Sequence, residues 1–199
     1  EVAGVITDSG LRSGVETYLT AEIGSLARVV SALAVLEEVS PRWLDAIAAV
    51  GELASSRIVA AALESRGGPA AWVDARKVMV TTAEHTAAPP LMEETGIKMT
   101  AALIPLLSAR RVPVMGGFVG ATVDGVTTTL GRGGSDYSAA IVGACIGASE
   151  IQIWTDVDGM LTADPRLVPS ARVVPQLSFD EASELAYFGA KVLHPATIL

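Results

Sequence analysis

Three short segments of this 199-residue chain carry groups that could do chemistry. The first runs from Gly131 to Asp136, between a threonine-rich stretch and the expected start of a helix. Glycines there expose backbone N–H groups, and the partial positive charge of a helix N-terminus favours an anion. Arg132 adds a planar guanidinium suited to a carboxylate or a phosphate. The segment predicts an anion-binding turn, with a purely structural glycine turn as the alternative.

Two familiar phosphate-binding loops do not fit this segment. In the dinucleotide fingerprint G-x-G-x-x-G, the third glycine would fall on Asp136. A Walker A loop needs Gly-Lys followed by Ser or Thr, and that triplet occurs nowhere in the chain. The residues alone therefore do not identify the anion that this turn would bind.

The other two segments lie toward the C-terminus. Residues 154–159 include two aspartates, Asp156 and Asp158, and Asp164-Pro165-Arg166 follows them. Acidic residues past the carboxyl end of a strand could orient a ribose or help to hold hydrated Mg²⁺ around a polyphosphate. A turn that caps the next element explains the same residues equally well. In residues 188–195, Lys191 follows a predicted helix end, either as a phosphate-binding cation or as a solvated charge.

Composition limits the class of protein. The chain has 14 Lys and Arg against 22 Asp and Glu, a net charge of −8, so we expect no nucleic-acid partner. The best candidate for a membrane span, residues 137–149, is shorter than the roughly 18 residues required, so we expect no membrane partner. The single cysteine, Cys145, fits a reducing cytosol and an inert buried thiol. We therefore expect a cytoplasmic location.

The segments must be positioned by alternating helices and strands, which predicts an α/β fold with a mainly parallel sheet. Turn chemistry marks Ser40-Pro41 as a helix start and Asp124-Gly125 as a hairpin. The predicted helices cover residues 11–38, 52–64, 100–110, 135–146 and 178–187. The predicted strands cover residues 71–74, 78–81, 112–118, 127–130 and 151–155, with the tail of another at 4–7. The apolar run 112–118 predicts a strand covered on both faces.

Together the three segments resemble the aspartate kinases of the amino-acid kinase family. Four runs in the family's order carry the resemblance: residues 127–137, 154–159, 162–166 and 184–195. Weaker similarity extends to residues 4–8, 51–55, 74–76 and 117–120, so the resemblance covers essentially the whole chain. It implies the amino-acid kinase, or carbamate kinase-like, fold: a mainly parallel central sheet sandwiched by helices.

The resemblance implies transfer of the ATP γ-phosphate to the side-chain carboxylate of L-aspartate. The product would be 4-phospho-L-aspartate, and the reaction the first step of lysine, threonine and methionine synthesis. The implied cofactors are ATP and Mg²⁺, with no residue assigned as a metal ligand. Because a carboxylate is already ionised near neutral pH, positioning and charge neutralisation suffice for such a transfer.

By motif, the resemblance also implies roles for individual residues. Glu52 would hold the aspartate amino group, Arg132 a substrate carboxylate, and Asp136 would organise the reacting centre. The aspartate pocket would also be lined by Thr7, Phe118, Gly133, Gly134 and Ser135. The nucleotide would contact Thr155, Asp156, Leu161, Arg166, Lys191 and Val192, although many family members carry a tyrosine at the position of Leu161.

One family feature is absent from these residues. Family members begin with a strand carrying Lys-Phe-Gly-Gly-Thr-Ser, whose lysine and glycines meet the phosphates. We therefore expect residues 1–199 to be an amino-acid kinase domain that lacks its first strands and any C-terminal regulatory domain, with impaired activity. A related carboxylate or carbamate kinase, or a non-catalytic fragment that needs a partner chain, are the alternatives. Assembly into a homo-oligomer stays open.

Overall fold

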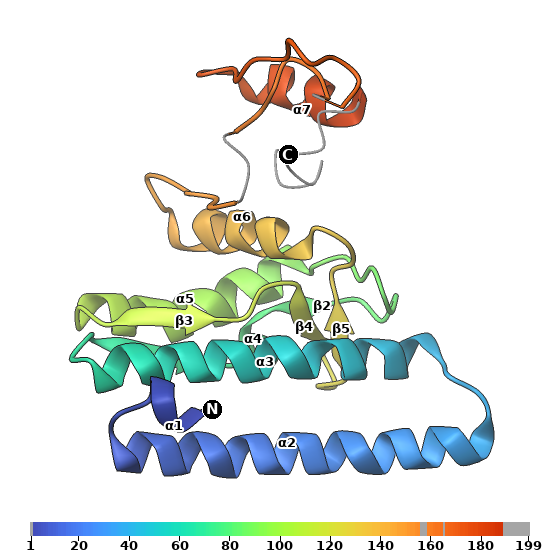
Figure 1. Cartoon of the computed structure of the whole chain (residues 1–199), viewed down its shortest axis with the longest axis vertical. Helices are drawn as coiled ribbons and strands as arrows, with labels where there is room; N and C mark the ends of the chain where they lie inside the picture. Colours follow the sequence, from blue (N-terminus) through green and yellow to red (C-terminus); the bar gives the residue numbers. More distant parts are fainter. Residues whose placement is uncertain (1, 156–158, 165, 189–199) are drawn as a thin grey trace.

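The computed structural model describes residues 2–155, 159–164 and 166–188 (Figure 1). Its helices are α1 (Val2–Val5), α2 (Ser9–Leu36), α3 (Pro41–Ser65), α4 (Ala75–Val78), α5 (Met92–Ser108), α6 (Gly134–Ile146) and α7 (Phe179–Phe188). Its strands are β1 (Ala70–Val73), β2 (Val80–Thr81), β3 (Val112–Met115), β4 (Val119–Thr122) and β5 (Thr127–Thr129). The alternation of helices and strands confirms the predicted α/β class.

Two long helices, α2 and α3, lie side by side along one face of the molecule (Figure 1). α2 begins where the Asp8 carboxylate accepts the Leu11 N–H at 2.8 Å. α3 begins at Pro41, as predicted, because proline lacks only an N–H that the first helical turn does not use. The helix predicted over residues 52–64 is the second half of α3, which ends before Gly67 at φ 83°.

The described strands form two small sheets. β1 pairs with β3 and β2 pairs with β4, both in parallel, while β5 pairs antiparallel with β4. The hairpin predicted at Asp124-Gly125 joins β4 to β5, with Gly125 at φ 80° and its N–H bound to the Thr122 carbonyl. The prediction of a mainly parallel sheet is confirmed, with an antiparallel hairpin at one end.

The strands lie between α3 on one side and α5 and α6 on the other (Figure 1). The main buried cluster joins the strands to α5 and α6 and consists of Val73, Val78, Met79, Met99, Leu103, Leu130 and Ile141. A second cluster joins them to α3 and consists of Ala49, Leu53, Ala75 and Val119. Helices therefore cover both faces of the strands, and α3 and α6 flank the loops that follow β3 and β5.

Three predicted strand segments are corrected by the structure. Residues 4–7 do not extend a strand: they follow or belong to α1, and Ile6 is buried against Val15 and the small residues of α3. β3 stops at Met115, short of the predicted residue 118; it contacts both α3 and α5, although Val112 at its start is 53% exposed. Residues 151–155 form no strand, since no described strand pairs with them and unpaired backbone groups favour water.

The C-terminal part of the described chain lies beyond residues 156–158 and ends in α7 (Figure 1). A capping box forms at its start, because Ser178 and Glu181 exchange hydrogen bonds of 2.8 to 3.2 Å. Hydrogen bonds from the Ser178 backbone and side chain lower the pKa of Glu181. The helix start is therefore fixed locally by two side chains.

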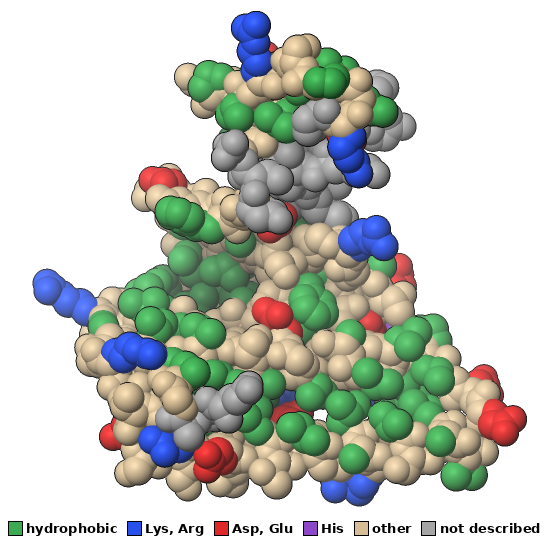
Figure 2. All heavy atoms as spheres, viewed as in Figure 1, with side chains coloured by type: hydrophobic (Ala, Val, Ile, Leu, Met, Phe, Trp, Pro, Cys, Tyr) green, Lys and Arg blue, Asp and Glu red, His purple; other side chains and the backbone are tan. Residues whose placement is uncertain are grey.

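Both long helices, α2 and α3, are long and apolar enough to cross a membrane by length and composition. The sequence-based expectation had considered only the shorter stretch 137–149, so it missed them. α3 contacts α2 and strands β1, β3 and β5, which is the position of a core helix. Figure 2 shows many apolar side chains on the face formed by α2 and α3. Packing against these elements accounts for part of the hydropathy of α3, since 33% of its most apolar 18-residue window is buried.

Candidate active site

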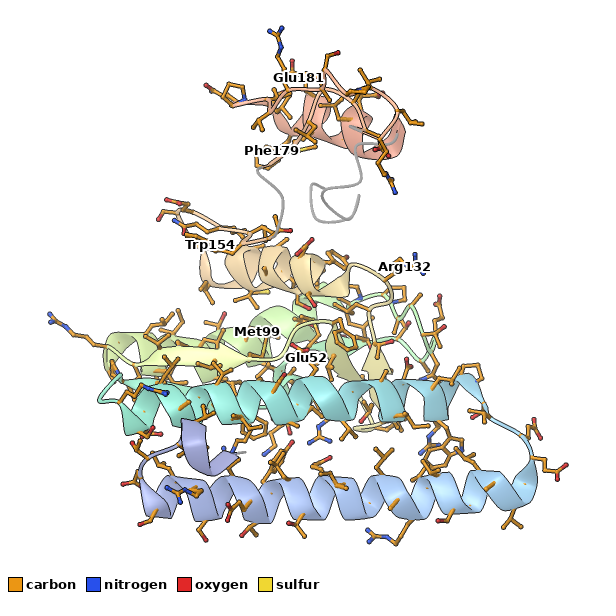
Figure 3. All side chains as sticks on the ribbon, viewed as in Figure 1. Glu52, Met99, Arg132, Trp154, Phe179 and Glu181 are labelled. Atoms are coloured by element: carbon orange, nitrogen blue, oxygen red, sulfur yellow. The ribbon has the colours of Figure 1, made fainter. Side chains whose placement is uncertain are left out.

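The first wall of the candidate site is the loop after β3, held by helix α3. The Gly117 N–H donates a 3.0 Å hydrogen bond to Oε1 of Glu52, which points from α3 toward the strands (Figure 3). A Cβ on Gly116 would lie 2.8 Å from Cγ of Glu52, so the backbone approaches this side chain more closely than any larger residue permits. Glu52 is half-buried, and the hydrogen bond described for its carboxylate uses Oε1.

The second wall is the turn between β5 and α6, and it packs directly on the first. A Cβ on Gly134 would lie 2.7 Å from Cβ of Phe118, and one on Gly117 would lie 2.9 Å from Ser135. Phe118 itself has φ 46°, a left-handed conformation that is costly for a bulky residue. The structure therefore brings together five residues predicted for the aspartate pocket: Glu52, Phe118, Gly133, Gly134 and Ser135.

The geometry of the second wall suits an anion. Gly131 at φ 83° and Gly133 at φ 71° turn the chain into α6, whose first intrahelical bond is made by Tyr137 to the Gly133 carbonyl. The N–H groups of Ser135 and Asp136 have no acceptor within the helix and lie at its positive end. Arg132 is exposed at the tip of the turn (Figure 3).

A cavity of about 430 Å³ opens where the two walls meet. Gly116, Gly117, Ser135 and Ser138 form its polar end. The rest of its surface is mostly apolar and comes from α5, β3, α6 and residues 148–151. The cavity places Ser135 and the Gly117 backbone on the surface of a space large enough for a small amino acid.

A buried carboxylate lies two turns before Glu52 on α3. Asp45 is 1% exposed, and its oxygens accept the Thr129 hydroxyl at 2.6 Å and the Thr86 N–H at 3.0 Å. Nδ1 of His85 lies 2.7 Å from Oδ2 of Asp45, and the His85 side chain is only 16% exposed. One carboxylate thus joins α3, β5 and the loop before α5.

The residues predicted to contact nucleotide lie past α6. Thr155 is exposed and Leu161 is half-buried, where it bridges Val173. Arg166 is exposed and binds both oxygens of Asp164, which raises the pKa of its guanidinium. Asp156, Lys191 and Val192 lie outside the described residues. Among those that are described, no group of three or more His, Cys, Asp and Glu side chains could hold a metal ion.

Thr7, which was predicted for the aspartate pocket, lies away from the other residues of that pocket. Its hydroxyl donates to the Ser65 carbonyl at 3.2 Å, at the C-terminal end of α3. Ser65 and Glu52 are 13 residues apart on that helix, which corresponds to about 20 Å along its axis. The described structure therefore gives Thr7 a role in the packing of the first residues against α3.

The α/β fold and the glycine turn at the N-terminus of α6 form an arrangement whose backbone donors suit an anion. The family model described as "Amino acid kinase family" matches residues 2–199, and the chain belongs to this family.

Its relatives in the comparison are aspartokinases. The chain is 44% identical over 160 residues to the lysine-sensitive aspartokinase 3 of Escherichia coli K12, covering 80% of this chain and 35% of that protein. It is 40% identical over 188 residues to the chloroplastic aspartokinase 3 of Arabidopsis thaliana, covering 93% and 34%. The chain thus spans about a third of the length of these curated relatives.

Solved structures agree with this relationship. The E. coli aspartokinase III crystal structure in complex with aspartate and ADP matches with a TM-score of 0.81 at 41% identity, over 90% of this chain and 40% of that one. The complex of the same enzyme with lysine and aspartate also matches with a TM-score of 0.81, at 37% identity, over 94% of this chain and 41% of that one. The resemblance and the fold predicted from the sequence motifs are confirmed.

Sequence reasoning gave no role to Asp45 or Ser138. A usable signal existed for Asp45: it is the one carboxylate in the mostly apolar stretch 41–51 of α3, seven residues before Glu52 and hence on the same face. Ser138 gave no such signal, because a serine one turn into a helix is common and its partner, Phe118, is distant in sequence.

Proposed function

We propose that this chain contributes the aspartate site of an aspartate kinase, which transfers the γ-phosphate of ATP to the side-chain carboxylate of L-aspartate. The observation that supports this most directly is the packing of the Gly116–Gly117 loop on the Gly131–Gly134 turn, with Glu52 and Arg132 on the two sides. Similarity to a structure that holds aspartate and ADP supports the same substrate pair. The product, 4-phospho-L-aspartate, would enter lysine, threonine and methionine synthesis.

An amino acid with two carboxylates needs one anionic partner and at least one cationic partner. Glu52 offers a carboxylate for the ammonium group, since the one described hydrogen bond of that carboxylate uses Oε1. Arg132 offers a planar pair of donors for a carboxylate. The N–H groups of Ser135 and Asp136 add donors at the positive end of α6. These groups fix the substrate so that its other carboxylate faces the phosphate donor.

In the reaction, an oxygen of the aspartate side chain forms a bond to the γ-phosphorus, and the bond from that phosphorus to the ADP oxygen breaks. ATP with Mg²⁺ supplies the phosphoryl group when bound. We assign Asp136, half-buried in the first turn of α6, to the reacting centre, and the exposed Thr155 to the nucleotide. Leu161 and Arg166 are assigned to the nucleotide, and Asp156, Lys191 and Val192 join them by motif alone.

The test is formation of an acyl phosphate, trapped as a hydroxamate, with ATP, Mg²⁺ and L-aspartate. It should be run on the 199-residue chain and on the longest form that the gene encodes. Replacing L-aspartate by L-glutamate or carbamate separates this proposal from a related carboxylate or carbamate kinase. If the folded, longest form makes no aspartate-dependent product, the proposal is contradicted. A product formed with glutamate but not with aspartate would indicate a related carboxylate kinase instead.

A matched pair of variants tests the assignment of Arg132. Arg132→Lys keeps the charge and loses the planar fork, so we expect the KM for aspartate to rise about 10- to 100-fold, the range of one charged hydrogen bond. Arg28→Lys, on the exposed face of α2, is the control and should leave both KM values unchanged. An unchanged KM for aspartate in Arg132→Lys would remove Arg132 from the site.

We further propose a cytoplasmic location, supported by the lone Cys145, with L-aspartate and ATP as the small-molecule partners. Similar plant proteins are named chloroplastic. Cell fractionation with an antibody against the chain tests the location, and recovery in a membrane or organelle fraction would contradict it.

A further inference from the structure

We infer that Asp45 is a positioning residue for the aspartate site: its buried carboxylate holds β5 and the loop over residues 82–90 so that Gly131 and Arg132 face the substrate. The inference rests on the proposed function. Asp45 itself lines no part of the 430 Å³ cavity. Its effect on the site passes through Thr129 and Thr86, one on each side of the turn.

Thr129 is the direct link along the chain. Its hydroxyl donates a 2.6 Å hydrogen bond to Oδ1 of Asp45, and both groups are buried. Gly131 follows two residues later, and the buried Leu130 between them donates its N–H to the Phe118 carbonyl at 2.8 Å. Because Thr129 and Leu130 are both anchored, the direction in which the chain leaves β5 toward Arg132 is fixed.

Thr86 is the link across space. It has φ 74°, a strained conformation for a β-branched residue, and its N–H lies 3.0 Å from both Asp45 oxygens. The Thr86 carbonyl would lie 3.1 Å from a Cβ on Gly131, so this turn presses directly on the glycine. Asp45 therefore holds the surface against which Gly131 rests, and the Ala88 N–H adds a 2.8 Å bond to the Thr129 carbonyl.

Asp45 and Glu52 each hold a different wall of the site. They are seven residues apart on α3, about two helical turns, and hence on one face. Glu52 binds the Gly117 N–H in the first wall, while Asp45 binds the supports of the second wall. The rigid helix thereby sets the separation between the groups that would hold the two ends of aspartate, a separation on which affinity depends steeply.

The test uses Thr129→Val, which removes one hydroxyl at nearly constant shape, and Thr129→Ser, which keeps the hydroxyl. Both are made in the longest form of the protein, together with Asp45→Asn. For Thr129→Val we expect the KM for aspartate to rise about tenfold or more, with the KM for ATP changed less than about twofold. Thr129→Ser should restore the aspartate KM. A general loss of stability would not raise one KM selectively or be reversed by serine.

A second readout does not depend on activity. Hydrogen exchange at the amides of residues 129–134 and 83–88 should accelerate in Thr129→Val and Asp45→Asn, while residues 116–118 stay protected. Glu52→Gln should show the reverse pattern. Unchanged exchange in residues 129–134, or an unchanged aspartate KM in Thr129→Val, overturns the inference. If the unmodified protein makes no aspartyl phosphate, the proposed function fails, and the exchange pattern still decides whether Asp45 positions the turn.

Discussion

The backbone N–H of Phe118 donates a 2.9 Å hydrogen bond to Oγ of Ser138, which in turn donates to the Gly134 carbonyl at 2.8 Å. These two hydrogen bonds connect the loop after β3 to the first turn of α6. Ser138 also supplies the acceptor for the backbone N–H of Phe118, whose φ is 46°. Ser138 therefore fixes the two walls of the candidate site against each other.

Removal of the Ser138 hydroxyl should loosen this connection. Ser138→Ala leaves the Phe118 N–H without its partner in a half-buried place, so we expect a loss of about 1–3 kcal/mol in the free energy of unfolding. Urea denaturation followed by tryptophan fluorescence measures the loss. Ser170→Ala, at an exposed position, is the control and should be neutral. Equal stabilities of the two variants would show that this bond contributes nothing.

Contact between the walls requires a glycine at position 134. In Gly134→Ala the new methyl group would lie 2.7 Å from Cβ of Phe118 and 3.0 Å from Cβ of Leu130, both in packed surroundings. We expect a destabilisation of about 1–3 kcal/mol, typical of overpacking. Gly14→Ala is the matched control, because nothing lies within 4 Å of its new methyl group on α2. That change should stabilise the protein by up to about 1 kcal/mol. Thermal denaturation of both variants checks the opposite signs.

We predict that the protein loses stability at alkaline pH because of Tyr18. Its hydroxyl oxygen is buried without a hydrogen-bond partner among the described residues, and burial, followed by the charge of Glu22, raises its pKa to about 12. Because the folded pKa exceeds the ordinary value of 10.0, the stability contributed by Tyr18 is complete below pH 10 and is lost as the pH rises toward 12. Urea midpoints at intervals from pH 8 to about pH 12 should fall less in Tyr18→Phe. A parallel fall in both proteins would contradict this origin.

Cys145 should react slowly in the folded protein. The side chain is half-buried against the core between α5 and α6, and burial raises the pKa of its thiol. Since the thiolate is the nucleophile, alkylation by iodoacetamide at neutral pH should be about tenfold slower or more than in urea. Mass spectrometry of quenched samples gives both rates. Similar rates with and without urea would instead indicate an accessible, reactive thiol.

Local chemistry in the sequence determined the long helices, the hairpin and the glycine turn. Pro41 and the Ser178–Glu181 capping box mark helix starts, and Asp124-Gly125 marks a hairpin, because each depends on a few adjacent residues. The motif around Arg132 was visible for the same reason. The family's fold followed from the order of the motifs, which the similarity to solved aspartokinases confirms.

Only the tertiary structure decided how distant segments meet. The sequence of residues 151–155 predicts a strand, yet a strand forms only where a neighbour satisfies its backbone, and no described strand lies beside it. Asp45 and His85 are 40 residues apart and show no local pattern that pairs them, but folding places their side chains 2.7 Å apart. Local hydrogen bonds and turn preferences act over a few residues and can be predicted from sequence. Burial and contact act through space, so the supports of the site became visible only when α3, β5 and the loop before α5 were assembled.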